Sequence, residues 1–120
     1  MEGFTEVPGT DGNVLKKIIT TEGPGDSPKT GQKVSVHYKG YFKDGTVFDQ
    51  SRGKKKSKPF VFKLGVGQVI RGWDVGVASM KKGEKATFYI KSEYAYGKLG
   101  AGGAIPPNTD LYFDVELINF

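Results

Sequence analysis

The sequence contains no cysteine and only one histidine, His37, among its 120 residues. The lack of cysteine excludes disulfides, thiolate metal sites and thiol nucleophiles. A single histidine excludes a multi-histidine metal site and disfavours a Ser–His triad. We therefore expect neither a bound metal nor covalent catalysis.

Long apolar runs and targeting signals are also missing. The first residues, Met1 to Phe4, form neither a basic nor an apolar signal region, and no apolar run approaches the length that spans a membrane. These features predict a soluble intracellular protein without a membrane partner, in the cytoplasm or alternatively the nucleus. The length suits one domain with its own core. We assign residues 1–11 to an N-terminal lead-in, which we expect to be frayed from Met1 to Val7, and 12–120 to that domain.

The basic character of the chain is local. The net charge of +5 equals the charge of five cations in one short stretch, namely Arg52, Lys54, Lys55, Lys56 and Lys58. We interpret this stretch as a solvated loop, so a nucleic-acid partner is not expected. The alternative, a nucleic-acid-binding element, predicts binding that weakens steeply with salt.

Hydrophobic periodicity predicts five or six strands and one helix. Apolar and polar residues alternate along most of the strand segments, which are residues 14–20, 33–42, 47–49, 60–64, 85–91 and 111–117. Such alternation is typical of an antiparallel sheet with one face in water. The fold class is therefore α+β, with a curved antiparallel sheet of five to six strands wrapped around one short helix.

The helix is predicted within the stretch 64–80, where apolar residues recur at spacings of three and four: Val69 or Ile70, Trp73, Val77 and Met80. Gly72 and Gly76 lie inside this stripe and indicate close contact with another element, since each costs about 1 kcal/mol relative to alanine. Lysines 81 and 82 with Gly83 are expected to close the helix, as cations in its last turn.

Six aromatic residues come from six separate segments, and a sheet packed on a helix does not require them: Tyr38, Phe48, Phe60, Trp73, Tyr96 and Phe113. Each by itself is more often a core residue than part of a binding site. Together, several at strand ends or beside a glycine-rich loop, they favour a pocket walled by rings. Asp49 would lie at its rim, although a solvated turn aspartate is an equal alternative. His37 is expected to be exposed or hydrogen-bonded.

Several runs resemble the signature of the FKBP-type peptidyl-prolyl isomerases, in order and with compatible spacing from Gly12 to Phe120. They are Val36-His37-Tyr38-Lys39-Gly40, residues 44–52 (DGTVFDQSR), Pro59-Phe60-Val61-Phe62, residues 67–73 (GQVIRGW), Tyr94-Ala95-Tyr96-Gly97 and Ile105-Pro106-Pro107-Asn108. Residues 1–10 and 92–108 are similar to the first domain of multidomain immunophilins. Ala101 and Ala104 depart from the family, where many small members carry bulkier residues.

The resemblance implies a cofactor-free enzyme that rotates X–Pro bonds, assists protein folding, and is bound and inhibited by tacrolimus and rapamycin. Its partners would be proline-containing peptides and proteins, and calcineurin or TOR kinase through the drug complex. The implied catalytic residues are Tyr38, Phe48, Asp49, Trp73, Tyr96 and Phe113. The implied substrate- and inhibitor-binding residues are Phe60, Val69, Ile70 and Ile105. A non-catalytic interaction module of the same fold is the alternative.

Overall fold

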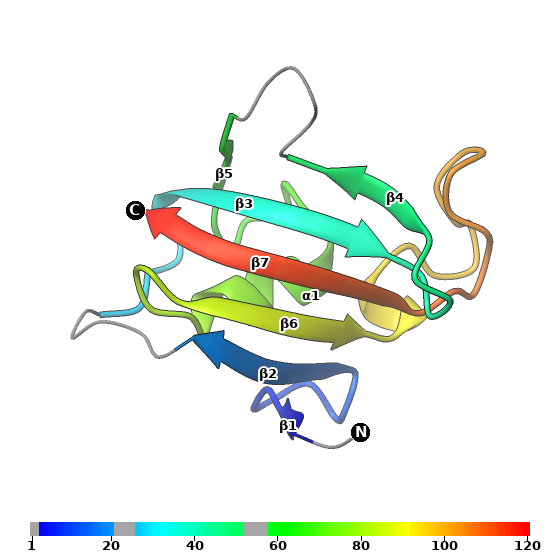
Figure 1. Ribbon diagram of the computed structural model, residues 1–120, viewed down its shortest axis with the longest axis horizontal. Coiled ribbons are helices and arrows are strands. Elements are labelled where there is room, and N and C mark those ends of the chain that lie inside the picture. Colours follow the sequence, from blue (N-terminus) through cyan, green and yellow to red (C-terminus); the bar gives the residue numbers. More distant parts are fainter. Residues whose placement is uncertain (1–2, 21–25, 52–57) are drawn as a thin grey trace.

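One antiparallel sheet curves around a single α-helix in the computed structural model, which describes residues 3–20, 26–51 and 58–120. Within these residues the strands are β1 (Thr5–Glu6), β2 (Val14–Thr20), β3 (Lys33–Tyr41), β4 (Val47–Gln50), β5 (Phe60–Lys63), β6 (Lys85–Ile90) and β7 (Leu111–Asn119). Their order is β1-β2-β6-β7-β3-β4, with β5 pairing β3. Helix α1 (Arg71–Ala78) lies behind the sheet in Figure 1. The predicted α+β class is confirmed.

The lead-in contributes a strand that the sequence did not suggest. Thr5 and Glu6 pair with Leu15 and Lys16 of β2, so this edge of the sheet carries a seventh strand. Val7 is buried beside them, and its N–H donates to the carbonyl of Val14. The expectation of a frayed lead-in was therefore wrong for this segment, because a two-residue strand is too short to show a period.

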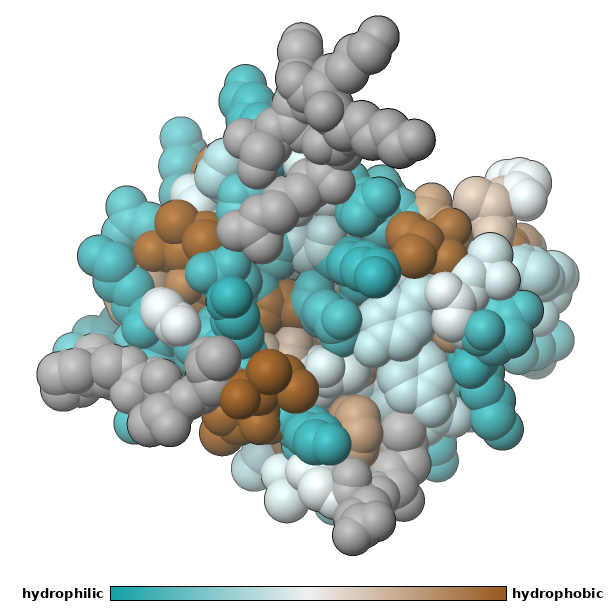
Figure 2. Space-filling model, viewed as in Figure 1, coloured by the Kyte–Doolittle hydropathy of each residue, from teal (hydrophilic) through white to brown (hydrophobic). Residues whose placement is uncertain are grey.

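Strand alternation divides the sheet into a dry and a wet face, as predicted. Along β7 the buried residues are Leu111, Phe113, Val115 and Leu117, and the residues between them are more exposed. Figure 2 looks onto the opposite face of the sheet from α1, where teal and pale residues predominate and brown patches are small. No helix in the described ranges is long and apolar enough to cross a membrane.

The helix is shorter than expected. It begins at Arg71, so Val69 and Ile70 precede it, and it ends at Ala78 without a basic residue in its last turn. Placing Lys81 and Lys82 in that turn was wrong. Both follow the helix, in the exposed turn before β6, where Gly83 adopts a positive φ of 86°.

The two helical glycines bring α1 directly onto β6, as their positions predicted. A Cβ atom at Gly72 would lie 2.5 Å from Ile90 Cγ2, and one at Gly76 would lie 3.0 Å from the Phe88 ring. Real Cβ contacts are not so short, so alanine at Gly72 would push the helix off the sheet. This close approach fixes where the helix places Trp73.

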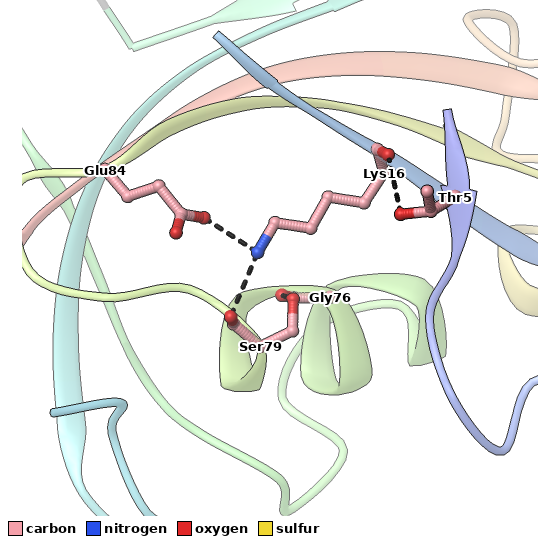
Figure 3. A network of polar contacts seen from close by, with 5 residues as sticks. All are labelled: Thr5, Lys16, Gly76, Ser79 and Glu84. Carbon is pink, nitrogen blue, oxygen red and sulfur yellow. Dashed lines mark hydrogen bonds and ion pairs between the residues drawn. The ribbon is translucent and has the colours of Figure 1, made fainter. Parts of the chain in front are cut away.

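The cation that lies at the helix C-terminus comes from β2. Figure 3 shows Lys16 reaching from that strand to Ser79 and Glu84. Its Nζ donates to the carbonyl oxygen of Ser79 over 2.9 Å and pairs with Glu84 Oε2 at 2.8 Å. The side chain of Glu84 is only 2% exposed and that of Lys16 10%. This buried ion pair joins β2, the helix end and the start of β6, and the lysine complements the partial negative charge of the helix end.

Candidate active site

Trp73 lies at the centre of a cluster of aromatic rings. It projects from α1, is 6% exposed, and contacts rings supplied by three strands. The ring centroid of Tyr38 lies 4.9 Å from that of the indole, and the centroids of Phe113, Phe62 and Phe60 lie at 5.3, 5.8 and 5.9 Å. Three of the four pairs are edge-to-face, the geometry that aromatic quadrupoles favour.

A cleft of about 250 Å³ opens above this cluster. Nine of the ten residues that the sequence predicted for the site line it, together with one that was not predicted. The lining residues are Tyr38, Phe48, Asp49, Phe60, Gln68, Val69, Ile70, Trp73, Tyr96 and Phe113. Ile105 is not among them, because it is 3% exposed and pairs with Ala101 in an isolated bridge. Gln68 lies in the motif at 67–73, but a polar residue in a loop gives no sequence signal of its own.

Gly40 makes room for one wall of the cleft. A Cβ at this position in β3 would lie 2.6 Å from Phe48 Cζ and 2.8 Å from Phe113 Cε1. The two phenylalanine rings meet edge-to-face with centroids 5.6 Å apart. Because no side chain fills the space at Gly40, the rings can lie over the strand and line the cleft.

Tyr38 and Asp49 form the polar edge of the cleft. The Tyr38 hydroxyl donates to Asp49 Oδ2 over 2.6 Å. Burial, and then this hydrogen bond and the nearby carboxylate charge, raise the pKa of Tyr38 well above its usual value. The phenol therefore stays protonated and remains a donor at physiological pH. The carboxylate itself is exposed at the rim, as predicted.

Ser51 fixes the end of β4 against β3. Its Oγ accepts the backbone N–H of Tyr38 over 2.8 Å and lies 2.8 Å from Nδ1 of His37. His37 is buried and hydrogen-bonded, so of the two expectations for this residue the hydrogen-bonded one is confirmed and the exposed one is wrong. These contacts set the position from which Asp49 reaches Tyr38.

The loop between β5 and α1 is held by Asp74, a residue in the first turn of the helix. Its Oδ1 accepts the N–H of Gly65 over 2.8 Å, and its Oδ2 accepts that of Gly67 over 3.0 Å. Both glycines have positive φ angles, which residues with a Cβ rarely adopt. The loop then presents Val69 and Ile70 to the cleft.

Replacing Asp74 with alanine is expected to free this loop. Hydrogen bonds to a charged acceptor contribute about 1.5–3 kcal/mol, so amide hydrogen exchange at Gly65 and Gly67 should accelerate by at least about tenfold. Exchange measured by NMR tests this. The amide of Lys91, which donates to the Asn13 carbonyl outside this loop, is the internal control. Equal acceleration at all three amides would indicate global destabilisation and contradict the assignment.

Two donors at the cleft have no partner among the described residues. The backbone N–H of Ile70 forms no hydrogen bond there, although its carbonyl accepts the N–H groups of Trp73 and Asp74. The Tyr96 hydroxyl has none either, and this residue is 39% exposed. Burial and the charge of Asp49 raise the pKa of Tyr96, so its hydroxyl also stays protonated. Both groups are free to donate to a bound molecule.

The cleft combines a floor and walls of aromatic rings with two free donors, so its geometry suits a bound group that carries an apolar ring beside a carbonyl oxygen. The described part of the chain holds no group of three or more histidine, cysteine, aspartate or glutamate side chains that could bind a metal ion.

The basic stretch 52–57 lies outside the described residues, so its interpretation as a solvated loop stays a prediction. Only Lys58 of that cluster is described, and it is exposed.

Comparison with known proteins identifies the family. Residues 25–118 match the family described as FKBP-type peptidyl-prolyl cis-trans isomerase. "FK506-binding protein 1" of Dictyostelium discoideum is 55% identical over 102 residues, which are 85% of this chain and 94% of that protein. "Peptidyl-prolyl cis-trans isomerase Fkbp12" of Drosophila melanogaster is 54% identical over 98 residues, 79% of this chain and 89% of that protein.

A longer relative matches as well. "Peptidyl-prolyl cis-trans isomerase FKBP4" of Homo sapiens is 47% identical over 121 aligned residues, which cover all of this chain and 26% of that protein. The family match spans most of the chain, and the shorter relatives are covered almost completely. This chain therefore belongs to the FKBP-type peptidyl-prolyl cis-trans isomerases and is an enzyme of that class.

Proposed function

We propose that the cleft above Trp73 is where this enzyme rotates X–Pro peptide bonds, with the prolyl ring resting on the indole. The observation that carries the proposal is the convergence of rings from four strands and the helix on one opening. Phe48, Phe60 and Phe113 would wall the prolyl ring. The substrates of the enzyme would be proline-containing peptides and folding proteins.

The chemistry of the reaction fits such a site. Rotation about an X–Pro bond has a barrier near 20 kcal/mol because amide resonance is lost when the bond twists, and the spontaneous reaction takes tens to hundreds of seconds. The twisted amide is less dipolar than either planar isomer. A cleft lined by rings and excluding water therefore destabilises the planar states more than the twisted one. No bond breaks, so no nucleophile is required.

Fixed donors add to this effect. We propose that the N–H of Ile70 and the hydroxyl of Tyr96 bind substrate carbonyl oxygens, since neither has a partner among the described residues. Donors placed so that they fit only the twisted geometry lower the barrier, because they bind the transition state better than the ground state. Tyr38 and Asp49 would hold the polar edge of the bound peptide.

The same cleft is proposed to bind the macrolides tacrolimus and rapamycin, which would inhibit the enzyme by occupying it. The Dictyostelium relative is named an FK506-binding protein, and FK506 is tacrolimus, so this similarity supports the proposal. With drug bound, calcineurin or TOR kinase would be the partner. Ala101 is half-buried and Ala104 is exposed, so the loop that carries them presents little side-chain area to a drug or peptide.

An isomerisation assay tests the assignment of the cleft. On a Leu-Pro or Phe-Pro peptide we expect the native enzyme to be inhibited by rapamycin, and Asp49→Ala to lower kcat/KM by about tenfold. That loss corresponds to about 1.4 kcal/mol, within the range of one charge-assisted hydrogen bond. Asp26→Ala, which changes an exposed carboxylate outside the cleft, is the control and should leave the rate unchanged. Uninhibited turnover with rapamycin bound would place the active site elsewhere.

A further inference from the structure

A second cleft, of about 500 Å³, lies at one end of the sheet. It is formed where the β3–β4 turn, the end of β6 and the start of β7 meet, on the right of Figure 1. None of its lining residues belongs to the cleft above Trp73. The isomerase mechanism proposed above does not use it.

Tyrosine rings form one wall of this second cleft. Tyr89 and Tyr112 are partners across β6 and β7, and their ring centroids lie 5.0 Å apart. Tyr41, the partner of Tyr112 on β3, stacks on it with centroids 5.6 Å apart and an interplanar angle of 9°. These rings stand on the wet face of the sheet, so the hydrophobic core does not account for them. Phe42 adds a further ring from the turn.

Two carboxylates border the rings. Asp44 is fully exposed, and hydrogen bonds from Thr46, chiefly from its backbone N–H at 2.9 Å, lower its pKa, so the group is charged at physiological pH. Asp110 accepts the Tyr89 hydroxyl over 2.5 Å and the N–H of Ser92 over 2.8 Å. Against these two carboxylates the lining has one cation, Lys43. Rings with adjacent carboxylates attract a cation through the ring quadrupole and through direct charge.

The second cleft adjoins the first. Phe42 lines the second cleft and Phe48 lines the cleft above Trp73, and their ring centroids are 5.0 Å apart. This pair of rings therefore connects the lining of one cleft with that of the other. An extended peptide covers about 3.3–3.6 Å per residue. A chain whose prolyl bond lies above Trp73 can therefore reach the second cleft within a few residues.

We propose that the second cleft binds the guanidinium or ammonium group of a basic side chain in the protein whose prolyl bond is isomerised. The position of that prolyl bond rests on the function proposed above. The charge of the lining excludes an acidic side chain as the favoured occupant, and the phenol and phenyl rings supply the flat surface that a guanidinium stacks on. The enzyme then prefers prolyl substrates with an arginine or lysine at a short distance from the proline.

The cleft is tested first by itself, without the isomerase reaction. The probe is N-acetyl-arginine amide, and the neutral N-acetyl-citrulline amide is its matched control, in an NMR titration of the labelled protein. The arginine probe should shift the amides of residues 42–44 and 108–110, and the citrulline probe should not. Equal binding of both probes, or shifts elsewhere only, would overturn the proposal.

Two neighbouring residues of opposite charge give a matched pair of variants. Asp44→Asn should weaken binding of the arginine probe about threefold, and Lys43→Gln should strengthen it about twofold, as expected for single exposed charges. Both residues are exposed, so neither change threatens the fold. The reverse order of effects would mean that the cleft binds anions, and a dimer that Asp44→Asn abolishes would assign the cleft to self-association; either result overturns the proposal.

The link to catalysis is tested with peptide pairs. Each pair contains a Leu-Pro bond and differs only in arginine or citrulline, placed about three to six residues from the proline on either side. At the best position, kcat/KM should be about three- to tenfold higher for arginine, and Asp44→Asn should bring the ratio close to one. A short Leu-Pro peptide without either residue should be turned over equally by both proteins. Failure of that short peptide would count against the isomerase site, whereas a ratio of one in the native enzyme at every position would count against the second cleft.

Discussion

Replacing Trp73 with leucine is expected to lower kcat/KM for a Leu-Pro peptide by about a hundredfold, equivalent to about 2.7 kcal/mol of transition-state stabilisation. The indole is the floor of the cleft and contacts four rings, so leucine would remove the surface on which the prolyl ring rests. Ring-on-ring contact alone contributes about 0.5–1.5 kcal/mol beyond area burial. The protease-free isomerisation assay measures the loss.

Phe62→Leu is the matched control for this prediction. Phe62 is also buried, at 4% exposure, and its ring centroid lies 5.8 Å from that of Trp73, but it does not line the cleft. Both variants should lose roughly 1–3 kcal/mol of stability in urea unfolding. Only Trp73→Leu should lose most of its activity. A similar loss of kcat/KM in the two variants would mean that general destabilisation, and not the floor of the cleft, explains the result.

Removing the cation of the buried ion pair should have the largest effect on stability. Lys16→Met leaves Glu84 buried without its partner, and breaking such a pair from one side costs about 3–5 kcal/mol. That is a large share of the 5–15 kcal/mol that stabilises a typical domain. The helix end also loses the donor to its Ser79 carbonyl. Urea unfolding followed by circular dichroism measures the change as a lower midpoint.

The double variant Lys16→Met with Glu84→Met separates the two causes. Replacing both charges with apolar groups is often close to neutral, so the double variant should regain most of the lost stability. The cycle then gives a coupling energy between the two residues. If the double variant is no more stable than Lys16→Met, the ion pair contributes little and the lysine acts mainly through Ser79.

Structural features that depend on the residues of a single helix or strand could be predicted from the sequence. The alternation along β7 and β6 gave their buried faces correctly, because each face repeats every second residue. Gly72 and Gly76 predicted the close approach of α1 to the sheet for the same local reason. Strand β1 could not be found, since two exposed residues carry no period and their pairing depends on β2.

The site was predicted for a different reason. No single aromatic residue distinguishes a ligand cleft from a core, and the list rested on motifs that resemble a family. The structure brings nine of those residues to one cleft and leaves Ile105 in the interior. Only the structure shows that Gln68 lines the cleft. The loop that places this residue depends on Asp74, whose carboxylate accepts two backbone N–H groups several residues away.

The sequence by itself determined the α+β class, the dry and wet faces of the strands and the absence of thiol chemistry, because these follow from residue type and short-range period. Only the tertiary structure decided which side chains from different elements contact one another. It placed Lys16 rather than Lys81 or Lys82 at the end of the helix, opened a cleft above one indole, and set tyrosines from two strands beside two carboxylates. Contacts between residues far apart in the chain depend on strand order and register, and no local pattern encodes either.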